Sequence, residues 1–146
     1  MPTSSSVRSA VIAASVGFLV AMGTQAHAQG LNVSGVWQGV NYTSQVPGPH
    51  KVVLTLNQAG TAVVGAFWVD TGVSGTGQGQ ITGPNSMTMS WTNTTPQCPG
   101  SYQNSYQVTG SSMTWTFTGQ DCLGQEQGKG NAKRTVALGK KTISKQ

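Results

Sequence analysis

The segment "QITGPNSMTMSW" (residues 80–91) holds the pattern that decides the fold, and it returns as "QVTGSSMTWTF" (107–117). In both copies a Gly-containing turn is followed by a short run in which apolar residues alternate with Thr or Ser. This alternation has the period of a half-buried β-strand. The repeat therefore predicts the same hairpin built twice, with Met87 and Met113 directly after the turns.

The same alternation continues along most of the chain, while strong helix formers are scarce. Eight strand-like runs are expected, at residues 35–42, 51–57, 62–69, 77–82, 86–92, 101–108, 112–118 and 128–136. A flat meander would leave two sheet edges open, and eight strands is a common number for closing those edges. We therefore expect an all-β protein, an eight-stranded antiparallel up-and-down (meander) β-barrel.

The connections between these runs are unequal. Those after the second, fourth and sixth runs are short, whereas the others are longer and richer in Gly, Pro, Ser or Cys, ending with "GQDCLGQEQ" (119–127). Alternate connections of an up-and-down barrel lie at the same end, so one end is expected to be tight and the other loose. Cys98 and Cys122 both fall at the loose end, and we expect a disulfide between them. Two cysteines without a nearby His make a poor zinc site, so no metal is expected.

The N-terminal segment is typical of a secretory signal. Arg8 precedes the apolar run 9–23, and "AHA" (26–28) offers small residues for cleavage after Ala28. The run is short for a membrane span, which remains the alternative. The expected organisation is a signal peptide at 1–28, a single barrel domain at 29–136 and a basic flexible tail at 137–146. The mature protein would be secreted or periplasmic.

A short motif resembles a known superfamily. Gly35 and Trp37 form a "G-x-W" that opens the first strand, and Arg134 lies near the end of the last, as in the calycins, which include lipocalins, fatty-acid-binding proteins and avidins. The resemblance implies that Trp37 and Arg134 pack together across the closed end. The segments 60–69 and 114–122 are most similar to avidin strands. However, Gly39 and Phe67 stand where avidins bind biotin through polar groups, so the chain is not a convincing biotin binder.

The alternation also assigns the interior. Large aromatic residues face a wall of small ones, including Gly77 and Gly79. Either the rings fill the barrel as a solid core, or they line an apolar cavity, and both interpretations remain open because alternation does not determine volume. The candidate ligand-binding residues, toward the loose end, are Asn41, Phe67, Trp91, Tyr102, Asn104, Tyr106, Trp115 and Phe117.

Little in the chain favours catalysis. His50 and three acids, Asp70, Asp121 and Glu126, lie in or beside the loops of the loose end, and nothing in the sequence forces them together. No "GxSxG" is present. We therefore expect a non-enzymatic protein without a cofactor. A rim cluster of His50, Asp70 and Asp121 is the alternative.

The outward residues of the first three strands form an apolar face that favours self-association or a protein partner. Its members are Val36, Val40, Val53, Val64 and Trp68. The net charge of +5 comes mostly from the end of the chain, where a solvated tail is expected. Because export is expected, nucleic acid is not expected as a partner.

Two candidate functions remain. The first is a carrier or sequestering protein for a small, largely apolar ligand. The second is a protein-binding, inhibitory or structural module that acts through its rim loops or its apolar face.

Overall fold

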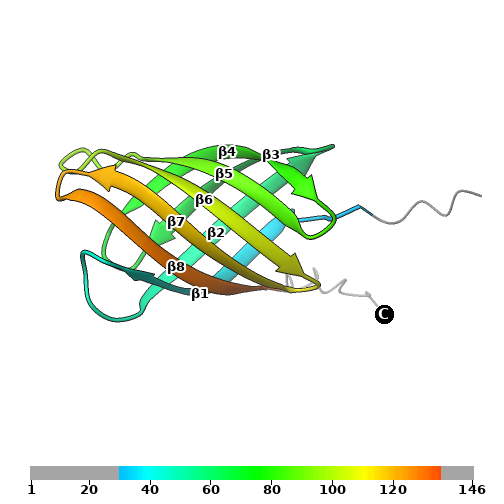
Figure 1. Cartoon of the computed structure of the whole chain (residues 1–146), viewed down its shortest axis with the longest axis horizontal. Helices are drawn as coiled ribbons and strands as arrows, with labels where there is room; N and C mark the ends of the chain where they lie inside the picture. The colour runs from blue at the N-terminus through cyan, green and yellow to red at the C-terminus, as the bar shows by residue number, and fades with distance from the viewer. Residues whose placement is uncertain (1–29, 136–146) are drawn as a thin grey trace, which may run out of the picture.

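The computed structural model describes residues 30–135, which form eight antiparallel strands in one closed barrel (Figure 1). The strands are β1 (Gly35–Thr43), β2 (His50–Ala59), β3 (Ala62–Val69), β4 (Ser74–Gly83), β5 (Ser86–Asn93), β6 (Gly100–Thr109), β7 (Ser112–Asp121) and β8 (Gly124–Arg134). Each strand pairs with its neighbours in the chain, and β1 closes the barrel against β8. The predicted all-β, eight-stranded meander barrel is confirmed. The predicted signal peptide (1–28) and tail (137–146) lie outside the described residues, and within those residues there is no helix that could cross a membrane.

One end of the barrel is closed by two-residue turns, at 60–61, 84–85 and 110–111. The chain enters β1 and leaves β8 at this same end, on the right of Figure 1. At the other end, 44–49, 70–73 and 94–99 are longer connections. We call these the closed end and the open end.

The prediction of a long loop at 119–127 is wrong. β7 continues to Asp121 and β8 begins at Gly124, so the connection between them has only two residues. A side-chain turn explains how it closes: Leu123 N donates to Asp121 Oδ1 at 2.8 Å, and Gly124 takes a positive φ of 110°. The open end therefore has three long connections and one tight hairpin.

The closed end is packed around Trp37. Its side chain is fully buried, and its indole Nε1 donates to the Val33 carbonyl at 2.9 Å. The Arg134 guanidinium lies over the ring, with its carbon 4.6 Å from the ring centroid. Met87 and Met113, which follow two of the closed-end turns, are also fully buried. The interior here is solid.

The segment before β1 adds a cover that was not predicted. Gln58 holds it in place, because its Oε1 accepts from Val33 N at 2.9 Å and its Nε2 donates to the Leu31 carbonyl at 2.8 Å. Gln58 N also donates to Ser34 Oγ at 2.9 Å. These bonds hold Val33, which is fully buried, against the core.

Candidate functional site

The open half of the barrel contains a cavity of about 180 Å³ that reaches the rim. All the residues predicted to contact a ligand lie on its wall: Asn41, Phe67, Trp91, Tyr102, Asn104, Tyr106, Trp115 and Phe117. Residues near the mouth that were not predicted also line it, among them Thr43, Gln45, His50, Asp121 and Glu126. The barrel is therefore solid at one end and hollow at the other, so each of the two sequence interpretations describes one half.

Glycines explain how large rings leave room in the lumen. Trp91 faces Gly77 across the β4–β5 pair, and a Cβ added at Gly77 would lie 2.6 Å from Trp91 Cδ2. Phe67 and Gly75 show the same close approach across β3 and β4, at 2.5 Å. The rings cover the neighbouring backbone where a side chain would otherwise stand. Together these rings contribute an apolar wall to the cavity.

Hydrogen bonds and ring contacts fix the orientation of this wall. Trp115 Nε1 donates to Asn41 Oδ1 at 3.1 Å, which leaves the Asn41 amide nitrogen for another partner. Phe67 and Trp91 meet edge to face, with their centroids 5.5 Å apart. The wall is therefore ordered before any ligand enters.

A buried hydrogen-bond network lies deeper in the cavity. Tyr106 Oη accepts from Trp91 Nε1 at 2.9 Å and from Asn104 Nδ2 at 3.0 Å, and burial raises the pKa of Tyr106, so its hydroxyl stays neutral. Asn104 Oδ1 is buried and has no hydrogen-bond partner among the described residues. If the amide is turned by 180°, Tyr106 can donate to Oδ1, and the NH₂ group is left unpaired instead. In both orientations one buried polar atom of Asn104 has no partner among the described residues.

The mouth carries two carboxylates that face the cavity, Asp121 and Glu126. Asp121 Oδ1 accepts from Gln45 Nε2 at 3.1 Å, and Tyr102 Oη donates to Asp121 Oδ2 at 3.4 Å. Burial raises the pKa of Tyr102 to about 12. Burial also raises the pKa of Glu126, with a further contribution from the charge of Asp121, while a hydrogen bond with Thr43 lowers it.

Only part of the alternative rim cluster is formed. His50 Nδ1 lies 3.5 Å from Asp70 Oδ1, so these two residues do come together. Asp121 instead contacts Gln45, Tyr102 and Leu123. The arrangement is a His–Asp contact beside the mouth, without the third member.

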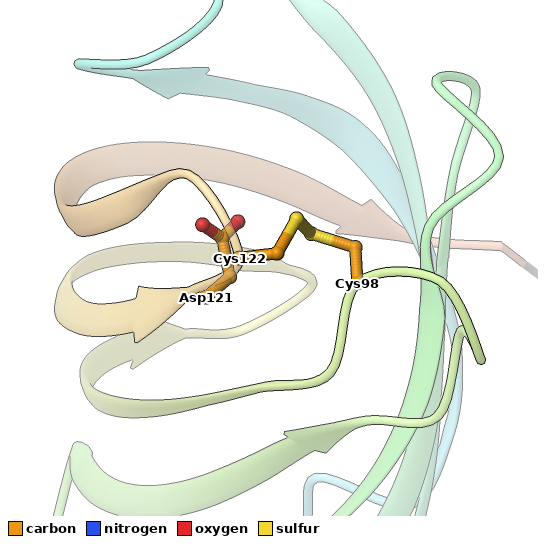
Figure 2. A group of neighbouring side chains, drawn as sticks. All are labelled: Cys98, Asp121 and Cys122. Carbon is orange, nitrogen blue, oxygen red and sulfur yellow. A yellow bond between two sulfur atoms is a disulfide. The ribbon is translucent and has the colours of Figure 1, made fainter.

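The predicted disulfide is confirmed. Cys98 from the β5–β6 loop is bonded to Cys122 in the β7–β8 turn, with their Cα atoms 4.9 Å apart, and Figure 2 shows the bridge beside Asp121. Ligand-type atoms of these three residues lie within 4.8 Å of one another. Both sulfur atoms belong to the disulfide, so neither can bind a metal as a thiolate. The one remaining carboxylate does not fit a zinc site. The bridge instead ties the edge of the mouth together.

The apolar outer face of β1–β3 was a separate prediction. Trp68 and Val64 are 47% and 53% exposed, and Val36 is also exposed, whereas Val40 and Val53 are half-buried. Val53 pairs with Trp68 across β2 and β3, so these two apolar residues lie side by side. The five residues lie away from the cavity wall, but polar residues of β2 interrupt the face, because Thr55, Lys51 and Asn57 pair with Val36, Val40 and Val64.

Comparisons with known proteins support the fold alone. No family model matches the chain, and no curated protein matches it. Among solved structures, a redesigned β-barrel named mFAP0, bound to DFHBI, matches with a TM-score of 0.51 and 12% sequence identity. The match covers 69% of this chain and 97% of that one. The protein is thus similar in fold to a barrel that binds a small molecule.

Proposed function

We propose that the protein is a non-catalytic binding protein that carries or sequesters a small, largely apolar ligand at the open end of its barrel. The observation that carries the proposal is the cavity of about 180 Å³ walled by ordered aromatic rings. An apolar core of this size would ordinarily be filled, because protein interiors pack densely. A hollow confined to one end, and open at its rim, is a typical ligand site.

The volume limits the size of the ligand. An engineered apolar cavity of roughly 150 Å³ holds one benzene molecule, whereas drug-sized ligands occupy pockets of roughly 300–1,000 Å³. A cavity of about 180 Å³ suits a compact molecule built on one ring or two fused rings. The Asn41 amide nitrogen, whose oxygen is already bound by Trp115, would orient such a ligand.

Other features support the proposed compartment and the proposed type of barrel. The disulfide suits an oxidising compartment, which agrees with secretion to the exterior or the periplasm. The packing of Arg134 on Trp37 across the closed end is the contact that the calycin resemblance implies, and it supports a calycin-like barrel.

A neutral one-ring probe, 2-phenylethanol, tests the proposal by isothermal titration calorimetry. We expect saturable 1:1 binding to the wild-type barrel. Val52 lies on the cavity wall and its neighbour Val53 lies on the outer face, so Val52→Phe and Val53→Phe add the same volume inside and outside. Binding should be lost in Val52→Phe and kept in Val53→Phe. Absence of binding in the wild type, or equal binding in both variants, would overturn the proposal.

The outer face supports a second candidate function, that of a protein-binding or oligomeric module. Exposed Trp68 beside Val53 is the observation that favours it, because large exposed apolar residues mark association surfaces. Sedimentation equilibrium tests it: we expect a dimer or larger assembly that Trp68→Lys dissociates. A monomer at all concentrations would exclude self-association through this face.

A further inference from the structure

The few acidic residues of this basic chain are gathered at one end. The sequence has three acids and a net charge of +5, and all three acids, Asp70, Asp121 and Glu126, lie at the open end of the barrel. Lys133 and Arg134 lie at the opposite, closed end of β8. Lys51 also lies at the open end, with its side chain exposed, so the three acids outnumber the Lys and Arg residues there although the overall charge is positive.

Two of these acids face the cavity without a counter-charge. Among residues 30–135, the single pairing of a basic with an acidic side chain joins His50 to Asp70, and Asp70 is outside the cavity wall. Asp121 contacts neutral donors, namely Gln45 Nε2, Leu123 N and the Tyr102 hydroxyl. Glu126 has Thr43 as its neutral partner. No Lys or Arg of the described barrel forms a salt bridge with Asp121 or Glu126, and His50, which also lines the cavity, pairs with Asp70 instead.

This placement is unfavourable for the empty protein. Asp121 and Glu126 are diagonal neighbours on β7 and β8, since Asp121 pairs with Gly124 and Glu126 with Gly119. Half-buried like charges repel each other and lose hydration, and the raised pKa of Glu126 reflects both effects. A neutral ligand would make this free energy still less favourable, because it would remove more water from the carboxylates, and an anion would add repulsion. A cation would relieve it.

We propose that the ligand of the cavity is an organic cation, with a compact apolar body held between Trp91, Trp115 and Phe117 and a protonated amine held at the mouth by Glu126 and Asp121. This inference rests on the proposed binding function and names its ligand class. An ammonium group supplies both the charge and the N–H donors that two acceptor-only carboxylates require. The aromatic wall supplies the remaining contact area for the apolar body.

Three probes of nearly equal size separate charge from shape: 2-phenylethylamine, 2-phenylethanol and 3-phenylpropionate. Calorimetry at pH 7 should show the amine binding about tenfold or more tightly than the alcohol, because a hydrogen-bonded charge adds to the same apolar contacts. The carboxylate should bind more weakly than the alcohol. In Glu126→Gln, and more completely with Asp121→Asn added, the amine and the alcohol should bind with nearly equal affinity, because the amine loses its charged partners. The alcohol should bind at least as tightly as it does to the wild type, because the carboxylates no longer lose hydration.

Asp70→Asn is the matched control, because it removes the same charge from the same rim outside the cavity wall. It should leave the preference for the amine within about twofold of its wild-type value, since exposed charges are screened at this separation. Equal binding of amine and alcohol to the wild type would overturn the inference but leave the binding function intact. A preference that survives in the Glu126→Gln/Asp121→Asn protein would also overturn it. If none of the three probes binds, both the inference and the proposed function fail.

Discussion

The two ends of the barrel are made from the same eight strands but use their interiors differently. At the closed end, Trp37 is fully buried, donates to the Val33 carbonyl and is covered by Arg134. At the open end, Trp91 lies against Gly77 on the wall and leaves the lumen free. The difference comes from what faces each ring. Trp91 pairs with Gly77 and lies against its backbone, whereas Trp37 pairs with Leu54 and Arg134 and has no glycine opposite it on either neighbouring strand.

The largest expected loss of stability follows from removal of the Trp37 side chain at the closed end. Trp37→Ala removes a fully buried ring together with its contact to Arg134, and should lower the free energy of unfolding by about 3–5 kcal/mol. Urea denaturation measures the change. The matched control, Trp68→Ala on the outer face, should cost less than about 1 kcal/mol because Trp68 is half exposed. Similar losses in the two variants would show that the closed end is not the solid part of the barrel.

Removal of the disulfide should come next and should act on the open end. Cys98 and Cys122 are 24 residues apart, and the double variant Cys98→Ala/Cys122→Ala should lose about 3 kcal/mol of stability through the loop-closure entropy. Urea denaturation gives this value. The indole N–H signal of Trp37 should keep its NMR position in the double variant. A shifted Trp37 signal would show that the two ends are not independent.

A smaller loss is expected when one wall glycine is filled. In Gly77→Ala the new Cβ would lie 2.6 Å from Trp91 Cδ2 and 2.7 Å from the Ser90 carbonyl oxygen, so Trp91 must move into the lumen. The cost should be about 1–3 kcal/mol, together with weaker binding of 2-phenylethanol. Gly83→Ala is the control, because the nearest atom there is the Ser86 hydroxyl of an exposed hairpin. Equal effects in the two variants would contradict the role of glycine in keeping the cavity open.

The smallest expected effect is a gain in stability. Burial and Asp121 raise the pKa of Glu126, so the folded protein holds this proton more tightly than the unfolded chain does. Above that raised pKa the ionised carboxylate weakens folding, and Glu126→Gln should therefore raise Tm at pH 7. The gain should shrink as the pH falls through the raised pKa and should vanish once Glu126 is protonated in both states. Differential scanning calorimetry from pH 7 to pH 3 follows it.

The groups around Glu126 determine how this pH dependence is assigned. Asp121 and Tyr102 are the titratable groups of β7 and β6 at the mouth, and Thr43 of β1 supplies a neutral hydrogen bond. Asp70→Asn should give no gain in Tm, because Asp70 is exposed and pairs with His50. An equal rise in Tm for Asp70→Asn would attribute the effect to net charge and not to the mouth.

Much of the site followed from the two-residue period of the strands. Inward alternation placed Trp91, Tyr106 and Trp115 on one wall, and the cavity is lined by them. The period did not reveal whether the lumen was full, because that depends on ring rotamers over glycines such as Gly77. Neither did it indicate loop residues of the mouth such as Gln45, which belong to no strand.

Asp121 and Glu126 were missed for a different reason, although a signal for them was present. The stretch 119–127 is rich in Gly, Gln and Cys, which is typical of a loop, so the strands were predicted to end early. Continuing the alternation by two steps from Phe117 leads to Asp121, and one step back from Gly128 leads to Glu126. Both positions face inward. The extended period would therefore have placed both carboxylates in the barrel.

The central claim, a hollow binding end opposite a solid end, is tested most directly by the indole N–H signals of the four tryptophans. Two lie on the cavity wall (Trp91 and Trp115), one is buried at the closed end (Trp37) and one is exposed outside (Trp68). Titration of ¹⁵N-labelled protein with 2-phenylethylamine should shift the signals of Trp91 and Trp115 in a saturable manner and leave those of Trp37 and Trp68 in place. Movement of Trp68 or Trp37 alone, or of all four signals together, would contradict the account.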